Sequence, residues 1–202
     1  MPDILTSLHG RKLGLSSNDE LVINSNNGLN KSAVMKVYNN TAASTAVSNT
    51  TSETMFDTFA TIPANTLAVG SSLRIRFQGI ATSTNSTDTL TIKLYIATVT
   101  TAGAITGTTL ISMAATDVAN NDVFTGEYEL NIRTIGSSGT MTGNGVFKSI
   151  PTAEGTMTSK DDILASTTVN TTVAQYIGVT AAWSVASASN SVRLDNIRVD
   201  LA

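Results

Sequence analysis

His9 is the only histidine in the chain and cysteine is absent, so the chain has one imidazole base and no thiol nucleophile. A Ser-His-Asp triad requires a base that a third group holds rigidly. His9 instead lies beside Gly10 in a polar N-terminal stretch. We interpret it as an exposed or interface histidine and not as a catalytic base. The lack of cysteine also excludes disulfides and thiolate metal sites.

Glu127 and Glu129 are spaced two residues apart, so they would share one face of a strand. Two carboxylates on one face could form the pair that glycosidases use. The alternative is an outward-facing pair that meets basic residues on neighbouring strands, such as Arg74, Arg76 or Lys93. We favour this second, structural interpretation.

Asp161 and Asp162 could offer oxygen ligands to calcium, but no Asp-x-Asp-x-Asp-Gly loop follows. The segment "TSKDDILAS" instead predicts one or two helical turns, with Ser159 as N-cap and both aspartates where the helix dipole favours negative charge. The glycine-rich segment 136–145 lacks the helix of a phosphate loop and predicts a hairpin. The sequence therefore predicts no catalytic residue, no cofactor and no metal.

Trp183 is flanked by Ala and Val at an inward position of its predicted strand, which favours a core residue over a sugar-stacking platform. N-x-Ser/Thr sequons are common by chance in a chain this rich in Asn and Thr, so we assign them no role. These sequons begin at Asn39, Asn49, Asn85 and Asn170.

The chain has 202 residues, of which 41% are hydrophobic but only 13% are charged. The hydrophobic content is enough for a core, and Thr, Ser and Asn replace the missing charge. A net charge of −3 with scattered Lys and Arg predicts no nucleic-acid partner. No apolar run suits a membrane helix, and the N-terminus lacks the order of a signal peptide, so we expect a soluble protein made in the cytoplasm.

Alternation of apolar and polar residues predicts a succession of strands from residue 33 onward. In "VFTGEYELNIRTI" the alternation slips around Gly126, and in "SVRLDNIRVDLA" it changes phase, which predicts a β-bulge near Asp195–Asn196. The predicted strands are 33–39, 54–62, 72–80, 89–98, 123–135, 140–150, 175–185 and 191–202.

Eight or nine strands joined by polar turns predict an all-β fold, an antiparallel β-sandwich. A jelly roll is the first choice because the longer connections at 98–122 and 150–168 suit it, and an immunoglobulin-like sandwich is the second. We expect residues 1–32 to form an N-terminal arm or short hairpin, with short strands at 13–15 and 21–23, and residues 33–202 to form the sandwich domain.

The predicted strand "DTLTIKLYIAT" has an outer face of Thr89, Thr91, Lys93 and Tyr95, which is unusually poor in charge. A face of this kind can meet another protein through hydrogen bonds and methyl contacts without burying charge. We therefore interpret the threonine-rich face as contact area for a symmetric partner.

Two segments resemble structural proteins of tailed bacteriophages. "PANTLAVGSSLRIRFQGIATSTNSTDTLTIKLYIA" (63–97) has the form Pro-x-Asn-Thr-Leu, a strand ending in Gly, a polar loop and Thr-Leu-x-Ile-x-Leu-Tyr-Ile, which is common among them. "LHGRKLGLSSNDELVI" (8–23) is similar to N-terminal segments of phage head-decoration and fibre proteins. The two segments cover about a quarter of the chain.

The resemblance implies a jelly-roll domain, usually trimeric, that is attached to a capsid or tail. The leading hypothesis is a capsid decoration (cement) protein that binds the outer capsid surface as a homotrimer and stabilises the shell, with the major capsid protein as partner. The alternative is a tail- or fibre-associated domain that recognises host carbohydrate, and a depolymerase comes third. Contact residues for the capsid or a neighbouring subunit are expected in the arm: Leu8, His9, Arg11, Lys12, Leu13 and Leu15.

Overall fold

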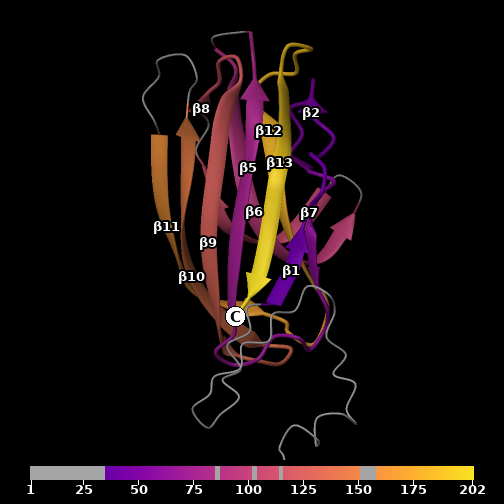
Figure 1. The fold of residues 1–202 in the computed structure, drawn as a ribbon, viewed down its shortest axis with the longest axis vertical. Helices are drawn as coiled ribbons and strands as arrows, with labels where there is room; N and C mark the ends of the chain where they lie inside the picture. The colour runs from indigo at the N-terminus through magenta and orange to yellow at the C-terminus, as the bar shows by residue number, and fades with distance from the viewer. Residues whose placement is uncertain (1–34, 85–86, 102–103, 114–115, 151–157) are drawn as a thin grey trace, which may run out of the picture.

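The computed structural model describes residues 35–84, 87–101, 104–113, 116–150 and 158–202, which form two antiparallel sheets packed face to face. Figure 1 looks onto the larger sheet, with the smaller sheet behind it. The predicted arm 1–32, with its six proposed contact residues and its two short strands, lies outside the described residues. No helix in the described ranges has the length and hydrophobicity of a membrane span.

The larger sheet, here called sheet A, has the strand order β1-β13-β5-β9-β10-β11, and β2 pairs with β13 at one end. In Figure 1 its strands run roughly vertically, from β11 at the left edge to β1 at the right. Its strands are β1 (Met35–Asn39), β2 (Val47–Ser48), β5 (Ser72–Thr82), β9 (Asp122–Thr134), β10 (Gly139–Ile150), β11 (Thr158–Val169) and β13 (Ser191–Leu201).

The smaller sheet, sheet B, has the order β3-β12-β6-β7, with β4 also on β12 and β8 also on β6. The chain passes repeatedly between the sheets, as from β4 to β5, β5 to β6 and β11 to β12. The prediction of an antiparallel β-sandwich of jelly-roll type is confirmed. Sheet B consists of β3 (Thr54–Met55), β4 (Ala60–Ile62), β6 (Thr89–Thr101), β7 (Ala104–Ser112), β8 (Thr116–Asp117) and β12 (Gln175–Trp183).

Strict alternation of buried and exposed side chains confirms the predicted inward residues of the central strands. Strand β5 buries Leu73, Ile75 and Phe77 and exposes the arginines between them. Strand β9 keeps the same alternation along its length, so the predicted slippage at Gly126 is wrong: Gly126 is an inward position over which the ring of Phe77 lies. The predicted β-bulge is confirmed, because the register of β13 against β5 shifts between Leu194 and Asn196.

Three other predictions were wrong. Segment 158–166 is not a helix but most of β11, whose backbone pairs with β10, so tertiary pairing overrides the local helix pattern. The expected long connections at 98–122 and 150–168 contain β7, β8 and β11. The predicted strand 54–62 is two short strands, β3 and β4, that pair with different parts of β12.

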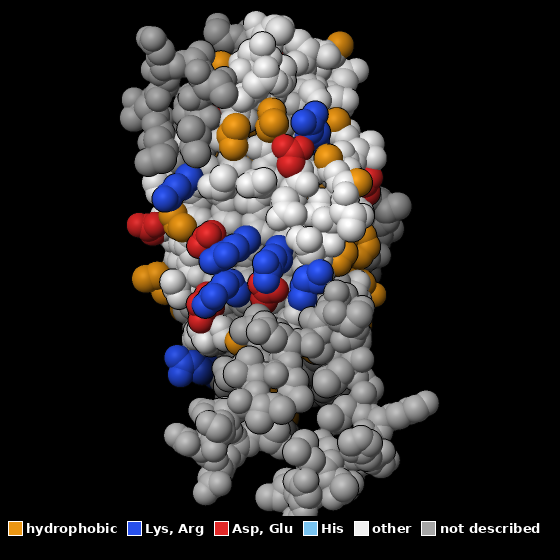
Figure 2. Space-filling model, in the orientation of Figure 1, with side chains coloured by type: hydrophobic (Ala, Val, Ile, Leu, Met, Phe, Trp, Pro, Cys, Tyr) orange, Lys and Arg blue, Asp and Glu red, His pale blue; other side chains and the backbone are white. Residues whose placement is uncertain are grey.

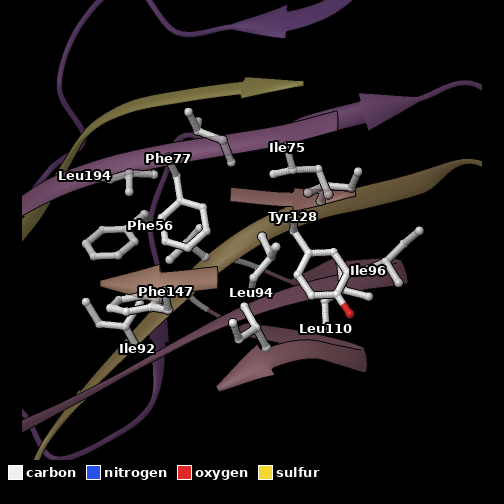
Figure 3. Packing of buried hydrophobic residues seen from close by; sticks show 14 of the residues in the cluster. Phe56, Ile75, Phe77, Ile92, Leu94, Ile96, Leu110, Tyr128, Phe147 and Leu194 are labelled. Atoms are coloured by element: carbon white, nitrogen blue, oxygen red, sulfur yellow. The ribbon is translucent and has the colours of Figure 1, made fainter. Parts of the chain in front are cut away.

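The core lies between the sheets and contains aliphatic and aromatic side chains from both (Figure 3). Phe147 of β10 is fully buried, stacks on Phe124 at a ring-centre distance of 6.1 Å and lies 5.7 Å from the ring of Phe77. Trp183 is buried and its indole nitrogen donates to the carbonyl of Val47, which confirms the prediction that it is a core residue.

Tyr128 of β9 carries a buried hydroxyl that lies near the backbone of Leu164 but makes no well-formed hydrogen bond among the described residues. Figure 3 shows the ring of Tyr128 within the hydrophobic core cluster. Burial, followed by the nearby carboxylate of Asp162, raises the pKa of Tyr128 to about 12, against a usual value near 10. The neutral phenol is therefore the form that the fold accommodates.

The variant Tyr128→Phe should raise the free energy of unfolding by about 1–2 kcal/mol, because a buried hydroxyl without a partner is costly. The stability that depends on the neutral phenol is complete below about pH 10 and is lost as pH rises towards about 12, since the unfolded chain releases its proton first. Urea unfolding at pH 7 and pH 11 measures both effects. Tyr176→Phe is the matched control, and equal changes in the two variants would contradict this account.

Candidate interaction surface

Charged side chains concentrate on the outer face of sheet A, where Figure 2 shows a band of basic and acidic groups. The described residues include nine Lys and Arg, and seven of them lie at outward positions of this face. Five carboxylates accompany them: Glu127, Glu129, Asp161, Asp195 and Asp200. The face thus has a net charge of +2, whereas the other described residues, with two cations and six carboxylates, have −4. The seven cations are Lys36, Arg74, Arg76, Arg133, Lys148, Arg193 and Arg198.

Strand register places these charges in rows across the sheet. Arg76 of β5 pairs with Glu127 of β9 at 3.2 Å, and Arg74 lies 3.9 Å from Glu129. The structural interpretation of the two glutamates is therefore confirmed for Arg74 and Arg76, although Lys93 lies on the other sheet. Each of the two carboxylates therefore has an arginine partner on an exposed sheet face, which is the cross-strand pairing of opposite charges that stabilises sheets.

Strand β13 continues the rows on the other side of β5. Arg198 donates through Nε to both carboxylate oxygens of Asp200, at 3.0 and 2.8 Å. Arg193 donates to Asp195 at 2.7 Å, beside the β-bulge. Register places Arg198 opposite Arg76, and Asp200 opposite Arg74. Four arginines of this face are therefore oriented by carboxylates of the same face.

Three cations of the face form no such ion pair within the described residues. Within the described residues, Lys36, Arg133 and Lys148 make no ion pair with a carboxylate. Arg133 donates instead to the hydroxyl of Thr142 at 3.3 Å. These three side chains carry the positive charge that the described carboxylates of the face leave unpaired.

A shallow groove of about 800 Å³ crosses the outer face of sheet A over β9, β10 and β11. Its walls include Arg133, Asn131 and Asn144, and Ile163 of β11 stands at its border with 81% of its surface exposed. Tyr128 is the one aromatic residue that contributes to the described lining, and its ring is buried on the inner side. The groove offers amide and charged groups but no exposed aromatic platform.

The threonine-rich outer face of sheet B is partly covered by the chain itself. Tyr95 is only 9% exposed and Thr180 only 2%, although both point away from the core. Met55 of β3 and Ile105 of β7 fill the space above Gly178 on the same face. The interpretation of this face as open contact area therefore does not hold at its centre.

Glu53 is the polar centre of that cover. Its carboxylate accepts hydrogen bonds from Lys93 at 2.7 Å, Tyr95 at 2.8 Å and Thr180 at 2.7 Å. Burial acts to raise the pKa of Glu53, but the hydrogen bonds from these three side chains outweigh it and hold the pKa below its usual value. These hydrogen bonds hold the residue before β3 against the outer face of sheet B. Both carboxylate oxygens of Glu53 therefore already accept hydrogen bonds.

Asp161 and Asp162 do not form a joint site, because adjacent residues of a strand point to opposite faces. Asp161 lies on the outer face, whereas Asp162 lies 3.4 Å from Lys160 at the inner side. In the described ranges, no three His, Cys, Asp or Glu residues come close enough together to hold a metal ion. The glycine-rich segment 136–145 forms part of the turn between β9 and β10 and the first part of β10, which confirms the hairpin.

Comparison with known proteins gives no family: neither a protein-family model nor a curated protein matches the chain. The solved structures that match include several lectins. Lectin I from Ulex europaeus, in complex with a methyl glycoside of α-L-fucose, has a TM-score of 0.38 and 12% identity over 92% of this chain and 90% of its own. A Lotus tetragonolobus seed lectin has a TM-score of 0.36 and 10% identity over 73% and 80%. At these scores the likeness assigns neither a function nor a binding site.

Proposed function

We propose that the chain is a non-catalytic structural protein of a tailed-phage virion, which binds the outer surface of the capsid as a homotrimer and stabilises the shell. One observation carries this proposal: the outer face of the larger sheet is a broad surface on which Glu127 and Glu129 are held in ion pairs. Such a surface suits lasting contact with another protein and not turnover. The sequence resemblance of residues 8–23 and 63–97 supports the same proposal.

The mechanism is the addition of interface area. A subunit that spans a joint between capsid subunits adds buried surface to the shell. Because it binds the assembled shell and not the separate capsid subunits, it raises the apparent stability of the shell by mass action. A cyclic trimer repeats the same contact three times, so weak individual contacts add through multivalency. Multi-angle light scattering on the purified chain tests for the trimer, and a monomer at all concentrations would contradict that part of the proposal.

Deleting residues 1–30 should leave a folded sandwich that no longer binds capsids. The buried core of the described residues extends from Val47 to Val199, all of it beyond the deleted segment in the sequence. The deleted segment contains the six predicted contact residues. Co-sedimentation with capsids that lack this protein measures binding, and urea unfolding controls for the fold. Full retention of the truncated chain on capsids would remove the arm from the mechanism.

A second candidate is recognition of host carbohydrate, which the groove over β9, β10 and β11 favours. Its amide and charged groups suit sugar hydroxyls, whereas the lack of an exposed aromatic in its described lining places this candidate second. Binding of the isolated chain to a glycan array, lost in an Asn144→Ala variant, would favour it over capsid binding.

A further inference from the structure

We propose that the outer face of sheet A is the docking face and that its partner is an acidic patch on a protein surface. The inference rests on the proposed function in one respect: the partner's acidic surface is the exterior of the capsid. It departs from the expectation that the threonine-rich face of sheet B makes the contact.

Charge segregation is the first step. The outer face of sheet A has a net charge of +2, whereas the other described residues together have −4. Lys36, Arg133 and Lys148 supply the positive charge that carboxylates of the face leave unpaired. Such an asymmetry steers an acidic surface towards this side of the molecule and away from the other sides.

Preorganisation is the second step. The side chains of Arg74, Arg76 and Arg198 are about half exposed, yet each already lies beside a carboxylate, at 3.9, 3.2 and 2.8 Å, that restrains its direction. A side chain that is ordered before binding loses less entropy when a partner arrives. Arginine also presents several donors in one plane, so it can keep its present partner and accept a second carboxylate.

The mixture of signs indicates protein and not nucleic acid as the partner. Glu127, Glu129 and Asp161 stand among the cations and would repel a continuous line of phosphates. A protein surface can place carboxylates near Lys36 and Lys148 and small or basic groups near the glutamates. Complementarity of this kind fixes the orientation and register of docking.

The experiment compares two full-length variants with the same change in net charge. One carries Lys36→Gln, Arg133→Gln and Lys148→Gln on sheet A. The control carries Thr61→Glu, Thr91→Glu and Thr109→Glu, which are outward positions of sheet B. Capsids that lack the protein are titrated with each variant at low and high salt, after thermal unfolding has shown that both variants fold.

The sheet A variant should bind about tenfold more weakly than the wild type at low salt, with a smaller loss of affinity on adding salt, since exposed interface charges act mainly through screened attraction. The control should bind within about twofold of the wild type, and a charge-preserving variant (Lys36→Arg, Arg133→Lys and Lys148→Arg) should restore binding. Equal binding by the sheet A variant and the wild type, or loss in the control alone, would overturn the docking face while leaving the proposed function intact. A wild-type chain that does not bind capsids would overturn both.

Discussion

The variant Phe147→Ala should lower the free energy of unfolding by about 4 kcal/mol, which makes it one of the two most damaging single changes expected here. Phe147 is fully buried at the middle of the sandwich, where it stacks on Phe124 and lies beside Phe77. Its truncation removes ring-to-ring contact and leaves a cavity that strands on both sides prevent from collapsing. Chemical denaturation with urea at pH 7 measures the loss.

Ile163→Ala is the control for that experiment, because Ile163 belongs to the neighbouring strand but is 81% exposed. Its free energy of unfolding should change by less than about 0.5 kcal/mol. A loss of under about 1 kcal/mol for Phe147→Ala would mean that the three rings do not form a packed cluster.

The variant Gly79→Ala should cost about 3 kcal/mol, although it adds a single methyl group. A Cβ atom on Gly79 would collide with the carbonyl oxygen of Arg193 and with the ring of Phe124. Gly79 pairs with Leu194, directly beside the β-bulge that brings the backbone of β13 close to β5. A backbone oxygen cannot move aside as a flexible side chain can, so the clash has to be absorbed by the sheet itself.

Gly70→Ala separates this steric effect from the conformational effect of replacing a glycine. Gly70 has a φ of 86° but open space around it, so its replacement costs only backbone strain of about 1 kcal/mol. Both variants are compared by thermal unfolding under identical conditions. If Gly79→Ala proved no more harmful than Gly70→Ala, the close approach of β13 to β5 at the bulge would be disproved.

The sequence could predict those strands in which apolar and polar residues alternate regularly, because that pattern does not depend on which strands pair in the sheet. In β5, one face of the strand has to carry Leu73, Ile75 and Phe77, whatever the position of β5 in the sheet. In β13, the change of phase in the alternation required an inserted residue. Strand β11 was missed because its identity depends on pairing with β10: "TSKDDILAS" by itself carries capping residues of a helix. Strand β7 was missed because Gly107 and the surrounding threonines give no clear alternation.

The candidate surface could be predicted only in part. The outward direction of Arg74 and Arg76 followed from parity, and their pairing with the glutamates was expected. The concentration of charge on one face could not be foreseen, because β1 and β13 come from opposite ends of the described chain and become neighbours only in the folded sheet. The cover over Tyr95 was missed for the same reason, since Glu53 lies 42 residues earlier.

The orientation of the sandwich on an intact virion tests the central claim most directly. A reconstruction of the particle by cryo-electron microscopy, at a resolution that separates the two sheets, would show which face is turned towards the shell. We predict that the arginine rows of β5 and β13 lie against acidic side chains of the capsid surface. A particle in which these rows point outward into solvent, with sheet B against the shell, would contradict the account.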